Sequence, residues 1–134
     1  MKILFHIGLA IVVSIILMCC SPSYSTDNIR IADDIIYNKE RKDILDYKGG
    51  RYEIPPEVVG YCKINDIILV KWKPKFPLDA IYDKYDYTAW LYSQDSLSFL
   101  YWSIDLKEEK QIGPMDSNAF DQFCCSRRIP PCPF

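Results

Sequence analysis

The chain has 134 residues and a formal net charge of −2, from 16 basic and 18 acidic side chains. This weakly acidic balance argues against nucleic acid as a partner, because phosphate recognition requires a basic face. The length suits one domain with one hydrophobic core.

The first 20 residues predict export and lipid attachment. Lys2 precedes an apolar run over residues 3–18, which has the length of a signal peptide core and is short for a membrane-spanning helix. Residues 17–19, Leu-Met-Cys, stand before Cys20 and resemble the bacterial lipobox. We therefore predict that residues 1–19 are a signal peptide, and that acyl chains such as palmitate on Cys20 hold the lipoprotein on a membrane.

Two other fates of this segment stay open: cleavage after Ser25, because residues 23–25 have a small-x-small pattern, and an uncleaved anchor. Ser21, not aspartate, follows Cys20, which by resemblance to enteric sorting rules favours the outer membrane of the cell envelope. The chain's one histidine, His6, lies in the predicted signal peptide. Its removal excludes a histidine base or metal ligand from the mature chain.

Four cysteines remain after Cys20, and their even number fits an oxidising compartment. A bond between the adjacent Cys124 and Cys125 is disfavoured by ring strain. We therefore predict two disulfides, which join Cys62 to one member of this pair and Cys132 to the other. Free buried thiols are the alternative. A zinc site is disfavoured, because the C-C-x6-C spacing is unusual and a fourth ligand is lacking.

Along the mature chain, residues 20–28 predict a lipidated tether, and residues 29–134 predict a single domain with a cysteine-rich tail. Runs of β-branched and aromatic residues between turn signals predict strand segments. These segments cover residues 29–37 with a break at Asp33 and Asp34, then 44–47, 51–54, 58–63, 67–72, 98–104 and 110–112. Residues 67–70 are apolar throughout, which indicates a strand buried on both faces.

Residues 75–96 interleave tyrosines and a tryptophan with aspartates, and we expect them to be partly strand and partly exposed loop. Gly113 and Pro114 should end the last strand. Asp116 or Ser117 can then cap a short helix. Its packed face should carry Ala119, Phe120 and Phe123.

The predicted fold is therefore mainly β, in the α+β class. It is an antiparallel sheet of about five to six strands built from hairpins, with one short C-terminal helix packed on it. The residues that we expect to be buried are Leu69, Trp102, Ile104, Phe120 and Phe123.

Several short motifs follow one another in this chain: I-P-P-E-V from Ile54, N-D-I-I-L-V from Asn65, Y-W-S-I-D from Tyr101 and G-P-M from Gly113. Their order resembles a small bacterial lipoprotein family catalogued only as a domain of unknown function, whose members share I-x-P-x-V, Y-x-I-I-D and G-P-L motifs. The resemblance covers residues 28–123 and departs around residues 75–96. It implies no activity, cofactor or catalytic residue.

Paired carboxylates are the first candidates for chemistry. Asp83 and Asp86 are three residues apart, but no glycine-punctuated ligand loop surrounds them, and a solvated acidic loop is the favoured interpretation. Asp33 and Asp34 would point to opposite faces of a strand. No serine has a histidine to activate it, and the five glycines form no phosphate-binding loop. We therefore predict no catalytic residue, metal site or cofactor.

The aromatic and acidic segment is the best candidate for binding, through Tyr82, Tyr85, Tyr87 and Trp90. Such rings offer flat apolar faces with a polar rim, which suit a protein surface or a sugar ring, although a small domain also uses them in its core. We predict a non-enzymatic envelope protein that binds a protein or glycan partner, or serves as an accessory factor. The alternative is a cell-wall or polysaccharide hydrolase that uses carboxylates.

Overall fold

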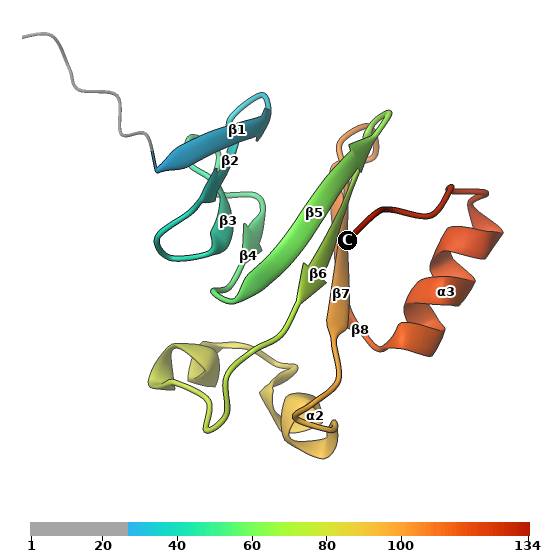
Figure 1. Cartoon of the computed structure of the whole chain (residues 1–134). Coiled ribbons are helices and arrows are strands. Elements are labelled where there is room, and N and C mark those ends of the chain that lie inside the picture. The colour runs from blue at the N-terminus through green and yellow to red at the C-terminus, as the bar shows by residue number, and fades with distance from the viewer. Residues whose placement is uncertain (1–26) are drawn as a thin grey trace, which may run out of the picture.

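The computed structural model describes residues 27–134, which form two four-stranded antiparallel sheets and three short helices (Figure 1). The first sheet contains β1 (Asn28–Ala32), β2 (Ile35–Asn38), β3 (Asp43–Asp46) and β4 (Glu53–Ile54). The second sheet contains β5 (Val58–Ile64), β6 (Ile67–Trp72), β7 (Leu100–Asp105) and β8 (Lys110–Met115). In each sheet the spatial order of the strands follows the chain.

The mainly β class and the helix near the C-terminus are confirmed. The prediction of one sheet with five to six strands is wrong in number, because the described residues form eight strands in two sheets. The signal peptide, Cys20 and the alternative cleavage after Ser25 lie outside the described residues. Asn28, placed at the end of the predicted tether, already belongs to β1.

The main hydrophobic core lies between the two sheets. Alternate residues of β6 reach it, because successive side chains of a strand point to opposite faces. Ile68, Val70 and Trp72 enter this core, whereas Leu69 faces the other way and is equally buried. The strand buried on both faces is therefore confirmed. The first sheet contributes Ile35, Ile44 and Ile54.

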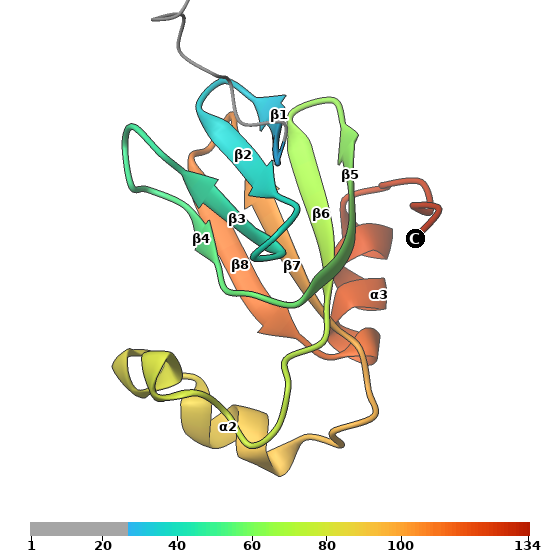
Figure 2. The ribbon, with the colours of Figure 1, turned by 60° about the vertical axis from the view of Figure 1, so that its left-hand side comes forward.

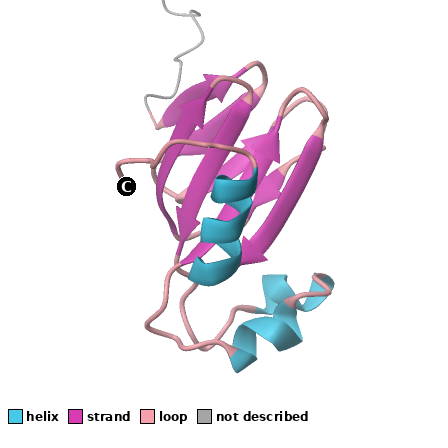
Figure 3. Ribbon diagram, turned by 90° about the vertical axis from the view of Figure 1, so that its right-hand side faces the viewer, coloured by secondary structure: helices cyan, strands magenta, loops and turns pink. Residues whose placement is uncertain are grey.

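A second, smaller core lies on the outer face of the second sheet, under α3 (Ser117–Ser126; Figure 3). The Asp116 carboxylate caps this helix by accepting a hydrogen bond of 2.8 Å from the amide of Ala119. Phe120 is buried and stacks on Tyr101 with ring centroids 4.2 Å apart. Phe123 is only half-buried and Ala119 is exposed, which corrects two predictions. A narrow stripe that contains Phe120 and Phe123 meets the sheet, and Ala119 lies to one side of it.

Truncation of Phe120 tests this packing. We expect Phe120→Ala to lower the free energy of unfolding by about 3 kcal/mol, because it removes a stacked ring and leaves a cavity under the helix. Urea denaturation followed by circular dichroism measures the change. Gln122→Ala, on the exposed side of the same helix, is the matched control and should stay within about 0.5 kcal/mol of the unmodified protein. A loss below about 1 kcal/mol for Phe120→Ala would show that the helix is peripheral.

The edges of the two sheets meet at β4 and β8. The Gln111 side chain accepts a hydrogen bond of 3.0 Å from the amide of Glu53 and donates one of 2.9 Å to the carbonyl of the same residue. Arg51 and Glu109 form an ion pair of 2.6 Å near this contact. The Gln111 side chain thus forms hydrogen bonds with backbone groups at the edge of β4 that would otherwise be unpaired.

Gly113 and Pro114 do not end β8, contrary to prediction, since the strand runs to Met115. Gly113 has a φ of +141°, and a Cβ at this position would lie 2.6 Å from a ring carbon of Trp102. Glycine is therefore required where the strand passes the Trp102 ring. Pro114 is tolerated because β8 is an edge strand, where a missing N–H breaks no ladder.

The segment between β6 and β7 contains no strand, which corrects the prediction for residues 75–96. It forms a 3-10 helix, η1 (Ala80–Lys84), and a short α-helix, α2 (Thr88–Ser93). Figure 2 shows this segment at one end of the sheets. Tyr82 and Leu91 are buried there and belong to the main core, so the segment closes that end of the domain.

The disulfide in the structure joins Cys62 on β5 to Cys132, with Cα atoms 6.3 Å apart. The predicted pairing with Cys124 and Cys125 is wrong, because both of these cysteines are free. After α3 the chain reverses: the amide of Ile129 donates to the carbonyl of Cys124 at 2.9 Å. The tail then runs back toward β5, and this path brings Cys132 to Cys62.

Candidate functional site

The structure places Tyr82, the first predicted binding residue, inside the domain. Its side chain is 4% exposed, and its hydroxyl donates a hydrogen bond of 3.3 Å to the carbonyl of Pro56. Burial raises the pKa of Tyr82 well above the usual value for tyrosine. Tyr82 is a core residue and cannot present its ring to a partner.

Tyr85, Tyr87 and Trp90 are half-buried and pack against the main core. Tyr87 meets the buried Trp102 edge to face at 5.5 Å and stacks on Tyr85 at 4.9 Å, both measured between ring centroids. The Tyr87 hydroxyl is buried and has no hydrogen-bond partner among the described residues, and burial raises its pKa. These rings support the closed end of the domain. Replacing Tyr85 and Tyr87 should therefore destabilise the domain as well as alter its surface.

Other apolar side chains of the same region reach solvent. Leu97 is 75% exposed, and Phe99 is 37% exposed. Leu97 is held in place, because the Asp95 carboxylate accepts a hydrogen bond of 2.9 Å from its amide and the Asp95 carbonyl accepts one of 3.0 Å from Ser98. Leu100, which follows, is anchored in the main core. The chain thus presents Leu97 from a turn fixed at both sides.

Two lysines surround the Phe99 ring. The Lys71 Nζ lies 4.2 Å and the Lys73 Nζ 5.1 Å from the ring centroid, which is the geometry of a cation–π contact. Within residues 27–134, neither ammonium group forms an ion pair with a carboxylate. We call Leu97, Phe99, Lys71 and Lys73 the Leu97–Phe99 surface. It is apolar at its centre and positively charged at its side.

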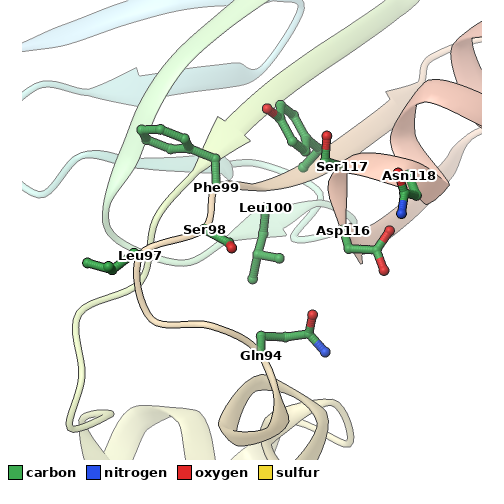
Figure 4. Close-up of a pocket in the computed structure, with 9 residues that line it drawn as sticks. Gln94, Leu97, Ser98, Phe99, Leu100, Asp116, Ser117 and Asn118 are labelled. Atoms are coloured by element: carbon green, nitrogen blue, oxygen red, sulfur yellow. The ribbon is translucent and has the colours of Figure 1, made fainter.

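A groove of about 340 Å³ lies beside this surface, between the start of β7 and the N-terminus of α3 (Figure 4). Figure 4 shows Leu100 between Gln94 and Asp116, while Leu97 and Phe99 point away from the helix. The other polar residues that line the groove include Ser98, Ser117 and Asn118. Hydroxyl, amide and carboxylate groups of this kind can donate to and accept from a polar ligand.

This groove offers little for carboxylate catalysis. Asp116 is the one carboxylate among the residues that line the groove, and one of its oxygens already caps α3. Asp83 and Asp86 are exposed, as expected for a solvated acidic segment. A glycoside hydrolase requires two carboxyl groups facing one bound sugar. In residues 27–134 no group of histidine, cysteine and acidic side chains is arranged to hold a metal ion.

Sequence reasoning missed the four residues of the Leu97–Phe99 surface. Phe99 lies in a predicted strand segment, so its side chain should point to the face opposite that of Leu100. This alternation does not predict whether other residues cover that face. Lys71 and Lys73 carry no sequence pattern that separates them from ordinary solvated charges. Only their cation–π contacts with Phe99 distinguish them, and the local sequence contains no signal for these contacts.

Comparison with known proteins gives no further assignment of this site. Within the part of the chain that the structure describes, no helix is long and apolar enough to cross a membrane. The resemblance to a small lipoprotein family stays a prediction. No protein-family model, curated protein or solved structure matches this chain.

Proposed function

We propose that this chain is an exported, lipid-anchored protein of the bacterial cell envelope that binds a protein or glycan partner without catalysing a reaction. The lipobox-like residues before Cys20 support the anchor. The fixed exposure of Leu97 is the observation that carries the binding part. An apolar side chain held in solvent by backbone hydrogen bonds offers contact area at little entropic cost, because it is already ordered.

The arrangement of the domain fits a partner on the side away from the membrane. Figures 1, 2 and 3 place β1 and the η1–α2 segment at opposite ends of the sheets. The proposed tether enters the domain at β1, and the Leu97–Phe99 surface follows α2. A lipid on Cys20 then leaves this surface accessible to other components of the envelope.

Lipid attachment has its own test. We expect the mature protein to begin at Cys20, to carry acyl mass and to partition with membranes, because a multiply acylated cysteine holds a protein durably on a bilayer. Intact-mass analysis of the membrane fraction measures this. Cys20→Ala should release the protein or leave the precursor uncleaved. A mature chain that begins at Thr26 without acyl mass would rule out the anchor.

The binding surface is tested by site-specific crosslinking in intact envelopes. A photoreactive benzoylphenylalanine at position 97 should form an adduct, whereas the same residue at position 47 should not. Tyr47 is 49% exposed in the turn after β3, so it is a matched position on the first sheet. Adducts of equal yield at both positions, or none at position 97, would contradict the assignment.

The lysines give a second readout in the same experiment. Lys71→Glu combined with Lys73→Glu should lower the yield of the position-97 adduct about tenfold, which corresponds to about 1.4 kcal/mol of binding free energy. Lys107→Glu in the turn after β7, combined with Lys110→Glu at the first residue of β8, changes the net charge equally and should leave the yield unchanged. If neither double change alters the adduct yield, Lys71 and Lys73 do not contribute to partner binding.

A further inference from the structure

Three cysteines meet at the second core. Cys62 on β5, Cys124 on α3 and Cys132 on the tail all pack against the cluster of Leu69, Met115 and Phe120. Cys124 and Cys132 also line one cavity of about 280 Å³ between the helix and the tail. Cys124, whose thiol is free, therefore lines the same cavity as Cys132 of the Cys62–Cys132 disulfide.

Non-covalent contacts hold the tail at both of its ends. Ile129, at its start, donates a hydrogen bond of 2.9 Å to the carbonyl of Cys124. Phe134, at its end, lies with its ring centroid 6.2 Å from that of Tyr101 and 6.3 Å from that of Phe120. The tail thus keeps its path beside α3 independently of which cysteine is bonded to Cys132.

We propose that Cys124 exchanges with the Cys62–Cys132 disulfide, so that the covalent attachment of the tail moves from β5 to α3. The Cys124 thiolate attacks Sγ of Cys132, the bond between Cys62 and Cys132 breaks, and a bond between Cys124 and Cys132 forms. The departing Cys62 thiolate takes up the proton that Cys124 lost. Cys62, Cys124 and Cys132 together hold one disulfide and one thiol before and after the step, so no oxidant or reductant is needed.

Cys125 provides the contrast. It is exposed and does not line the cavity, although it is the next residue of the same helix. Burial, with a contribution from Asp121, raises the pKa of the Cys124 thiol. Asp121 on α3 and Tyr101 on β7 are the other titratable side chains that line the cavity. Only the thiolate attacks a disulfide, so exchange should accelerate as the pH rises.

Tryptic mapping of the purified full chain tests the exchange, because cleavage places Cys62, Cys124 with Cys125, and Cys132 on three separate peptides: residues 52–63, 111–127 and 129–134. Protein is incubated without added thiol or oxidant, alkylated with N-ethylmaleimide and digested without reduction. We expect peptide 129–134 to pass from peptide 52–63 to peptide 111–127. The rate should rise about tenfold between pH 6.5 and 7.5, because the thiolate fraction of a group with a higher pKa rises tenfold. Protein alkylated at the start is the reference.

Matched variants assign the nucleophile. Cys124→Ser and Cys124→Ala should both abolish the transfer, and Cys125→Ser should preserve it; far-ultraviolet circular dichroism checks that each variant is folded. The proposal is overturned if peptide 129–134 stays on peptide 52–63 in the unmodified protein. Loss of transfer in Cys125→Ser, or a rate that increases with protein concentration, would overturn it equally. None of these outcomes bears on partner binding, which the crosslinking experiment tests separately.

Discussion

Cys132→Ser should lower the free energy of unfolding by about 4 kcal/mol. The Cys62–Cys132 bond joins residues 70 positions apart, and closing a loop of this length removes much conformational entropy from the unfolded chain. Urea denaturation under non-reducing conditions measures the change.

Cys125→Ser is the control for this experiment. Cys125 is an exposed free thiol, and its replacement should change the free energy of unfolding by less than about 0.5 kcal/mol. The unmodified protein with its disulfide reduced should match Cys132→Ser. A loss below about 1 kcal/mol for Cys132→Ser, or an equal loss for both variants, would show that this disulfide does not stabilise the fold.

Trp72→Ala should be the most destabilising single change in the domain, with a loss of about 5 kcal/mol. The Trp72 side chain is 0% exposed, and its ring centroid lies 5.4 Å from that of Trp102. Its indole N–H donates to the carbonyls of Pro55 and Pro56 at 3.1 and 2.8 Å. Alanine leaves a large cavity and the Pro55 carbonyl without its donor, at the turn where the chain passes from the first sheet to the second. The Pro56 carbonyl keeps the hydrogen bond from the Tyr82 hydroxyl.

Two further variants separate packing from hydrogen bonding at this position. Trp72→Phe keeps most of the ring and removes the N–H, so it should cost about 1 to 3 kcal/mol. Trp90→Ala removes a half-buried ring from α2 and should cost clearly less than Trp72→Ala. Thermal or urea unfolding followed by circular dichroism suits all three variants. An equal loss for Trp90→Ala and Trp72→Ala would show that the core is centred on the η1–α2 segment instead.

The hairpins were predictable because their signals are local. Asn65 and Asp66 form the turn between β5 and β6, and Asn65 has a φ of +52°, a conformation that asparagine tolerates. The helix after Asp116 was predictable for the same reason, since a capping aspartate precedes it. Period-two alternation says which residues share a face of a strand. It does not say which hairpins join into one sheet, so the division of the strands into two sheets was missed.

The candidate site shows the same limit. The aromatic residues of the η1–α2 segment were recognised from composition, but composition cannot distinguish a ring that closes a core from one that faces a partner. Tyr82 is buried because this segment folds over the end of the main core. Leu97 is exposed because the turn at Asp95 directs it outward. Whether each of these side chains is buried or exposed depends on how the long segment between β6 and β7 packs against the sheets.

The amino-acid sequence by itself determined the strand-forming segments and the capped helix, and it predicts export from the pattern at the N-terminus. Each of these is a property of neighbouring residues or of composition. Only the tertiary structure decided the two-sheet arrangement, the Cys62–Cys132 pairing and the approach of Lys71 and Lys73 to Phe99. The physical reason is that each of these joins residues distant in the chain, and such contacts form only where the packing of both cores is most favourable.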